Sequence, residues 1–488
     1  MFDLDEYRRR SESFLEEISR EHYRHLAGHK PTLEIDVIYA GYADLFERDA
    51  VEELRALPGD DERRARYLLH FAFDGFLGRQ TTRQEEELAD LEAALEVELD
   101  DERVGFRQVA AELANEHDPE RRAALEAARN ELAATKLDPL HLELLEHAHG
   151  VCRELGWAGY ADAHASLRGV DFQRLAAKTR AFLKDTDPTY ATTVDPELEA
   201  VGVPPLGALA RSDLPRLFRA EHLDGPFDGE RMVPALRQTL AGMGIDLAAQ
   251  DNVTVDAEAR PTKSPRAFCS TPQVPGEVYL VVAPVGGRGD FDALFHEAGH
   301  TEHYAHVDAE LPFEYRHLGD NAVTESFAFL VEHLVADPAW LGETLGIEDP
   351  EPVASHARAA KLMMLRRYAA KLDYELELHA AEPNLDAMPR RYSELLGSAT
   401  RVQWPQASWL SDVDGGFYVA CYLRAWALEM HWRDALRERF GERWYANAAA
   451  GDWLRGLWRE GQRLSAEELL SETLGEELGF ELLTAELG

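Results

Sequence analysis

Apolar residues recur at intervals of three and four along most of the chain, which is the spacing of one face of an α-helix. Residues 63–80 and 171–185 show this pattern clearly. It predicts successive helices over residues 1–183 and again from Phe291 to the C-terminal end. The charged segment 81–102 is too short for sustained heptads, so we expect an antiparallel helical hairpin there rather than a coiled coil.

Two parts of the chain break the helical pattern. Residues 184–230 are rich in proline, glycine and aspartate, and they predict a long, ordered connection. Two short runs of aromatic and β-branched residues, "RAFCS" and "EVYLVVA", flank "TPQVPG" and predict a pair of strands. We therefore expect a mainly α protein with one small β-sheet, organised as regions 1–183, 184–230 and 231–488.

The charge balance narrows the classes of partner. Asp and Glu total 91 against 51 Lys and Arg, a formal net charge of -40. Such a surface repels phosphate backbones and anionic lipids, so neither nucleic acid nor a membrane is an expected partner. The charge fits a well-solvated surface, and the alternative is an acidic cleft that attracts basic substrates.

Targeting signals and cysteine pairs are also missing from the sequence. There is no apolar run of 18 residues and no apolar N-terminal stretch, so a cytoplasmic protein is expected. The three cysteines are widely spaced and odd in number, which argues against both a disulfide framework and a cysteine zinc site.

The motif "HEAGH" carries the clearest chemistry in the sequence. On a helix beginning at Phe291, His296 and His300 are four residues apart and share one face. Glu297 lies beside them and can reach a water on a bound metal. Two neutral imidazoles with an open position suit one Zn²⁺ per chain, which polarises a carbonyl and lowers the pKa of water.

The third ligand must come from elsewhere in the chain. A continued helix rotates His306 away from the metal face, and His303 is better suited to support or packing than to ligation. Glu325 is the better candidate, because it begins a second helix after a loop long enough to turn the chain back. Glu332 lies seven residues later on the same face, where a carboxylate can hold a ligating histidine in its tautomer.

Five segments in the same order resemble the thimet oligopeptidase and oligoendopeptidase F family of zinc peptidases. They are "ELGWAGYADAHASL", "RPTKSPRAFCSTPQVPGEVYLVV", "GDFDALFHEAGH", the glutamate pair of "NAVTESFAFLVEHL", and "GGFYVACYLRAWAL". The resemblance covers about residues 150 to 475. It implies an elongated, multi-helix peptidase fold with zinc at the floor of a deep central channel that admits only short peptides.

The resemblance also implies how a peptide binds. An exposed sheet edge would pair with the extended substrate, and "EVYLVVA" is the candidate strand, with Tyr279 as a substrate contact. Tyr418 and Tyr422 would donate to the oxyanion that develops in the transition state.

The chain departs from the family pattern around these tyrosines. The family histidine that precedes the block falls at or near Asp412, and two family tyrosines fall on Val413 or Asp414 and on Ala420. These departures bear on rate and substrate preference rather than on the zinc site.

The sequence thus predicts a zinc oligopeptidase that hydrolyses internal bonds of short peptides, with Glu297 as the general base. One alternative is a related carboxypeptidase or dipeptidyl carboxypeptidase, in which Arg424 would bind the substrate's C-terminal carboxylate. Another is a catalytically impaired homologue that binds zinc and peptide, which the altered tyrosine block favours and the retained Glu297 opposes. The oligomeric state is left open.

Overall fold

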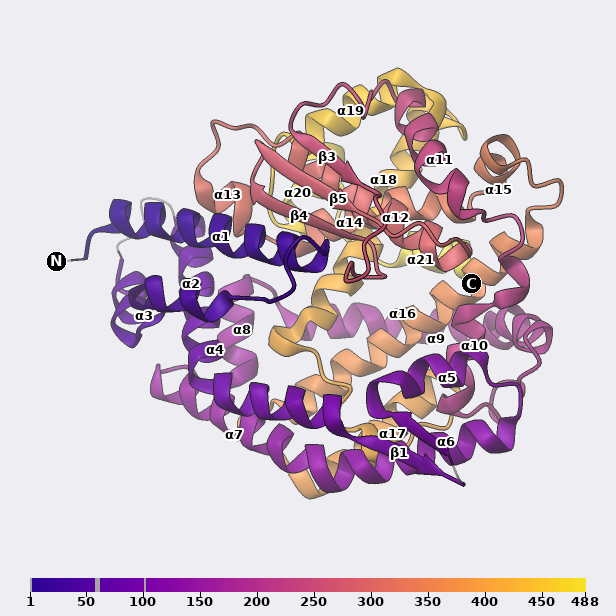
Figure 1. Ribbon diagram of the computed structural model, residues 1–488, viewed down its shortest axis with the longest axis horizontal. Helices are drawn as coiled ribbons and strands as arrows, with labels where there is room; N and C mark the ends of the chain where they lie inside the picture. The colour runs from indigo at the N-terminus through magenta and orange to yellow at the C-terminus, as the bar shows by residue number, and fades with distance from the viewer. Residues whose placement is uncertain (1, 58–61, 101) are drawn as a thin grey trace. The chain divides into compact units, whose positions relative to one another are not determined.

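A computed structural model describes residues 2–57, 62–100 and 102–488 of the chain (Figure 1). It is mainly helical, with 70% helix and 6% strand, as the sequence predicted. No helix among the described residues is long and apolar enough to cross a membrane.

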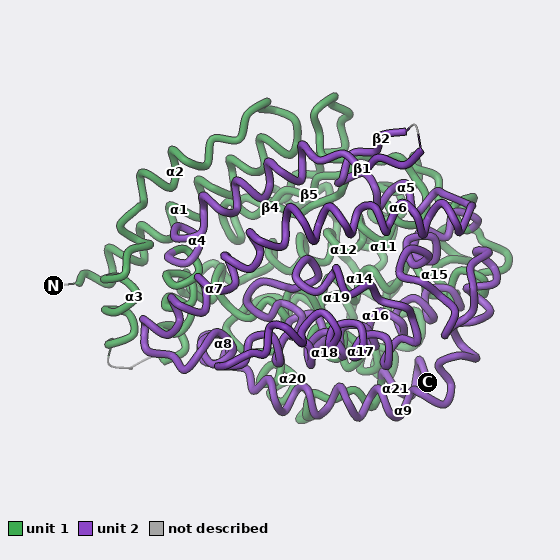
Figure 2. The backbone as a smooth tube through the Cα atoms, turned by 90° about the horizontal axis from the view of Figure 1, so that it is seen from below, with its two compact units in different colours: residues 1–75, 223–354, 424–482 green, residues 76–222, 355–423, 483–488 purple. Residues whose placement is uncertain are grey.

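The chain forms two compact units, each assembled from segments that are far apart in the sequence (Figure 2). Unit 1 comprises Met1–Gly75, Leu223–Ala354 and Arg424–Leu482, and unit 2 comprises Phe76–His222, Ser355–Leu423 and Leu483–Gly488. This division differs from the three consecutive regions that the composition suggested.

The helices and strands of each unit have the following bounds. Unit 1 contains α1 (Leu4–Leu26), α2 (Ile35–Gly41), α3 (Arg48–Arg55), α11 (Gly229–Gly242), β3 (Val253–Asp256), β4 (Phe268–Gln273), β5 (Glu277–Val281), α12 (Arg288–Ala305), α13 (Phe313–His317), α14 (Asn321–Glu332), α15 (Pro338–Trp340), α19 (Ala448–Trp458) and α20 (Ala466–Leu474). Unit 2 contains β1 (Glu96–Leu99), β2 (Glu102–Gly105), α5 (Val109–Asn115), α6 (Pro119–Leu132), α7 (Asp138–Glu154), α8 (Tyr160–Arg168), α9 (Phe172–Ala200), α10 (Leu214–Arg219) and α17 (Met388–Thr400). The unit boundaries fall within α4 (Glu62–Ala94), α16 (Glu351–Leu378), α18 (Tyr418–Phe440) and α21 (Glu481–Leu487).

The sheet of unit 1 has three strands in the order β3-β5-β4. The predicted strand pair is present, because β4 and β5 run antiparallel, and β3 adds a parallel strand on the other side of β5. Helices α12 and α1 both pack against this sheet. Because β5 is hydrogen-bonded on both sides, the expectation that "EVYLVVA" offers an exposed edge to a peptide is wrong.

Residues 184–200, expected to belong to a connection, are instead the C-terminal part of α9. Pro188 and Pro196 lie inside this helix. Tertiary contacts outweigh the helix-breaking tendency of these two prolines. The buried Tyr190, for example, donates a 3.0 Å hydrogen bond to the carbonyl of Thr400. The Arg366 guanidinium also bonds the hydroxyl of Thr186, at 2.7 Å. An amphipathic helix face buried in this way is not visible in composition alone.

The helical hairpin expected over residues 81–102 is also wrong. Helix α4 ends at Ala94, and the chain then forms the antiparallel pair β1–β2. Val97 on β1 is fully buried and packs with Phe106 and Leu125. The β-branched residues of this segment therefore favour strands, and their effect outweighs the helical preference of the residues around them.

Candidate metal centre

Helices α12 and α14 pack closely, and a glycine allows this approach. A Cβ atom added at Gly299 would lie 2.5 Å from both the Cα of Ala328 and the carbonyl oxygen of Phe327. Helix α14 begins at an N-cap, since the Asp320 carboxylate accepts a 3.0 Å hydrogen bond from the N–H of Ala322. The close approach at Gly299 and the N-cap at Asp320 together fix the position of the start of α14 against α12.

The closely packed helices bring two histidines and one glutamate together. The Nε2 atoms of His296 and His300 lie 3.4 and 3.7 Å from the same carboxylate oxygen of Glu325, and all three ligand atoms lie within 4.8 Å of one another. Neighbouring ligand atoms in a tetrahedral zinc site are roughly 3.3–3.6 Å apart, given bonds of about 2.0–2.2 Å. The donor set and its spacing therefore fit Zn²⁺.

Both histidines are held by their other ring nitrogen. The Nδ1 of His296 lies 2.8 Å from a carboxylate oxygen of Glu332, and the Nδ1 of His300 lies 2.8 Å from the hydroxyl of Thr324. If each Nδ1 carries the proton, each Nε2 presents its lone pair to the metal position. Glu332 makes the contact that its sequence position predicted, whereas Thr324 was not anticipated, although it directly precedes Glu325.

The electrostatics of the site favour positive charge between its carboxylates. Burial lowers the pKa of His296, but hydrogen bonds to Glu325 and Glu332 outweigh it and raise this pKa to about 10. Burial, together with the neighbouring His296, lowers the pKa of His300 to about 4. His300 is therefore the neutral imidazole at pH 7. Glu325 and Glu332 favour a positive charge, either a proton or a metal ion, at His296.

Glu297 projects from the same helix toward the sheet. Its carboxylate accepts a 2.8 Å hydrogen bond from the N–H of Cys269 on β4. Burial raises the pKa of Glu297 to about 7, although His296 and the Cys269 N–H favour its charged form. A carboxylate with a pKa near neutrality suits proton transfer at physiological pH.

The two later histidines of α12 do not reach the ligand atoms. His303 is fully buried, and its Nε2 lies 3.3 Å from the carbonyl of Gly461. His306 caps the end of α12, with its Nδ1 2.8 Å from the carbonyl of Glu302 and its ring against Trp458. These contacts agree with the exclusion of His306 from the ligand set and favour a packing role for His303.

Two residues expected to bind substrate are engaged in other contacts. Tyr279 stacks on Tyr23 of α1, with ring centroids 3.7 Å apart, and its hydroxyl donates a 2.7 Å hydrogen bond to Glu277. The Arg424 guanidinium is buried and forms ion pairs with both Asp320 and Glu467. Arg424 thus holds the N-cap of α14, which favours a positioning role over carboxylate binding.

Tyr418 and Tyr422 lie at the start of α18, in the part that belongs to unit 2. Their rings share one helix face, with centroids 5.0 Å apart, as their spacing predicted. The chain enters the helix through a sharp turn in which Gly416 and Phe417 have φ of 62° and 57°. Their approach to the metal centre of unit 1 stays a prediction.

Asp412, at or near the position where the resemblance places a histidine, is part of a charged network in unit 2. Its carboxylate accepts a 2.6 Å hydrogen bond from Tyr392 and pairs with Arg367 and with Lys371. The Lys371 ammonium also pairs with Asp414 at 2.6 Å. This network anchors the loop before the tyrosines to α16 and α17.

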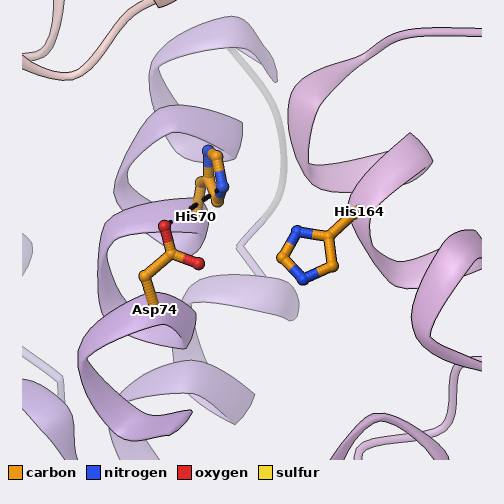
Figure 3. A group of neighbouring side chains, drawn as sticks. All are labelled: His70, Asp74 and His164. Atoms are coloured by element: carbon orange, nitrogen blue, oxygen red, sulfur yellow. Dashed lines mark ion pairs between the residues drawn. The ribbon is translucent and has the colours of Figure 1, made fainter. Parts of the chain in front are cut away.

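His70 and Asp74 form a separate pair, one turn apart on α4 and 3.2 Å between ring nitrogen and carboxylate (Figure 3). His164, also drawn there, belongs to α8 of unit 2. Because the pair and His164 belong to different units, no metal site is assigned to them.

Comparisons with known proteins add no family assignment. No protein-family model matches the chain, and no curated protein matches its sequence.

Proposed function

We propose that this protein is a zinc-dependent oligopeptidase that hydrolyses internal bonds of short peptides, with one Zn²⁺ per chain. The observation that carries the proposal is the convergence of His296, His300 and Glu325 within ligand distance, with Glu297 beside them. The resemblance to the thimet oligopeptidase and oligoendopeptidase F family supports the substrate class and the channel, in a cytoplasmic enzyme.

The chain's own residues divide the chemistry between them. Zinc, when bound, supplies Lewis-acid polarisation of the peptide carbonyl and a water of lowered pKa. Glu297 takes the proton from the attacking water and delivers it to the leaving amine. Glu332 and Thr324 keep both histidines oriented, and Tyr418 or Tyr422 donates to the oxyanion.

The substrate would lie along the sheet edge nearest Glu297. Strand β4 is an edge strand, and its Cys269 N–H points to Glu297 rather than to β5. An extended peptide beside β4 would gain main-chain hydrogen bonds that are independent of its sequence. We propose β4 in place of β5 for this contact.

The ligand set is tested by metal content. Glu325→Ala should lose zinc and His306→Ala should keep it, because Glu325, unlike His306, faces both Nε2 atoms. Loss of zinc from the His306 variant alone would overturn the assignment.

The general base is tested separately. Glu297→Gln should keep zinc and the melting temperature but lose most peptidase activity, because glutamine is nearly isosteric and cannot accept the proton. Equal turnover of an unstructured peptide library by wild type and variant would contradict this role.

A further inference from the structure

A cavity of about 490 Å³ opens beside the candidate metal centre, within unit 1. His296 and Glu297 form part of its wall, so a group bound there would lie next to the reacting atoms. The first turns of α12 and residues next to β4 and β5 form other parts of the wall. Its charged lining residues outside the ligand set are Arg266, Asp290, Asp292, Glu297 and Glu332.

The carboxylates of this wall differ in the hydrogen bonds and ion pairs that they already form. Asp290 accepts a 3.0 Å hydrogen bond from the N–H of Gly286, and Glu332 contacts His296. Asp292 accepts no hydrogen bond from any described residue. Its ion pair with Arg288 is 3.6 Å long, which exceeds a hydrogen bond. Asp292 is therefore the wall carboxylate with the most unused capacity.

Asp292 and Glu332 also repel each other across the wall. Their side chains are 31% and 34% exposed, so both are in contact with solvent. Burial and the nearby Glu332 together raise the pKa of Asp292 to about 6, against the opposing effect of Arg288. A cation bound between the two carboxylates would relieve this repulsion.

Arg266 is the one arginine or lysine among the lining residues, and its side chain is exposed. Four carboxylates therefore share the wall with the Arg266 guanidinium and the His296 imidazole, in a chain whose net charge is -40. The field of the whole protein adds to the local excess of negative charge.

We infer that this cavity binds a positively charged group of the peptide substrate, and that Asp292 determines the preference. The inference rests on the proposed peptidase function and names its substrate class. The cation can be a lysine or arginine side chain near the scissile bond, or the free α-amino group of a short peptide.

The test compares peptides that differ only in charge. Lysine and its neutral analogue norleucine are placed in turn at each position around one cleavable bond, with the N-terminus either free or acetylated. At one of these positions, wild-type kcat/KM should be about tenfold higher for the lysine peptide than for the norleucine peptide. This factor corresponds to the contribution of about one half-buried, charge-assisted hydrogen bond. If the α-amino group is the cation, acetylation should instead cost that factor.

The matched variants are Asp292→Asn and Asp251→Asn, since Asp251 is an exposed carboxylate outside the cavity. The advantage should shrink to within about twofold in Asp292→Asn and persist in Asp251→Asn. Zinc content and melting temperature show whether each variant is folded. The wild-type peptide series decides the preference even if Asp292→Asn does not fold.

Each outcome separates the cavity from the catalytic proposal. Equal cleavage of all wild-type pairs, or faster cleavage of the norleucine peptides, overturns the cation preference and leaves the peptidase standing. Binding of the peptides to zinc-loaded Glu297→Gln gives a readout without turnover. Lysine-selective binding that requires Asp292, with no cleavage by wild type, supports the cavity and refutes the peptidase. Neither binding nor cleavage refutes both.

Discussion

Each of the two proposed metal-binding histidines contacts one supporting side chain through its Nδ1, and the two supports differ in strength. His296 contacts the charged Glu332, whereas His300 contacts the neutral hydroxyl of Thr324. A charged acceptor stabilises an imidazole N–H more than a neutral one does. The two ligands therefore depend unequally on their supports.

Removing the charged support should weaken metal binding without unfolding the protein. Glu332→Ala is expected to lower zinc affinity by about 10–100-fold, and Thr324→Val by less. Competitive titration with a chelator measures the affinity, and Glu348→Ala, at an exposed glutamate outside the centre, is the control. An unchanged affinity in Glu332→Ala would show that His296 is oriented by packing alone.

Arg424 offers a second test at the residue scale, because its two possible roles predict different losses. Its guanidinium is buried between Asp320 and Glu467, so Arg424→Gln leaves both carboxylates without their cation. We expect a loss of about 3–5 kcal/mol in the free energy of unfolding. Arg237→Gln, at an exposed position of α11, should cost far less. A raised KM for peptides with a free C-terminus, at unchanged stability, would instead support carboxylate binding.

At the scale of elements, the centre depends on how closely α14 approaches α12. Gly299→Ala forces a Cβ atom against backbone atoms of α14, which cannot rotate away as a side chain can. The variant should lose about 1–3 kcal/mol of stability and bind zinc at least about tenfold more weakly, because Glu325 moves with its helix.

The control for this prediction is another helical glycine of unit 1. A Cβ added at Gly456 in α19 meets nothing within 4 Å, so Gly456→Ala should keep both zinc affinity and melting temperature. Thermal unfolding and chelator competition measure the two quantities. Full zinc affinity in Gly299→Ala would mean that the helices can separate without moving Glu325.

The sequence predicts those elements of the site whose spacing is local. The i, i+4 histidines and the seven-residue spacing of Glu325 and Glu332 follow from helical geometry, and β4 and β5 follow from their aromatic and β-branched residues. Strand β3 was missed because "VTVD" is only four residues long and pairs with a strand distant in sequence. Because β3 was not predicted, β5 was expected to be an edge strand. Thr324 contacts His300, and Asp292 lies near Glu332, only in the folded chain.

At the scale of the whole molecule, stability depends on buried groups that must be uncharged in the folded protein. Unit 2 buries His149 and His379 against each other, with Nε2 and Nδ1 2.9 Å apart. The buried Tyr160 stacks on both rings, and its hydroxyl accepts a 2.8 Å hydrogen bond from the N–H of Gly416. These histidines thus connect α7 and α16 to the turn that precedes Tyr418.

This cluster predicts acid sensitivity of unit 2. Burial lowers the pKa of His149 to about 4, with a further contribution from Arg153, and burial holds the pKa of His379 well below its usual value. Above pH 6.5 these histidines are neutral in both states and cost nothing. As the pH falls below 6.5 the unfolded chain takes up protons that the folded chain cannot, so the free energy of unfolding falls.

For His149 alone, the loss between pH 7 and pH 5 is roughly 2 kcal/mol, given an unfolded pKa of about 6.5. His149→Gln should therefore be less stable than wild type at pH 7, where it disturbs the pair, and should close that gap as the pH falls to 5. The exposed His117→Gln should leave the pH dependence as in wild type. Denaturant unfolding at pH 7, 6 and 5 measures all three proteins. A gap that stays constant over this range would show that His149 takes up its proton equally in the folded and unfolded states.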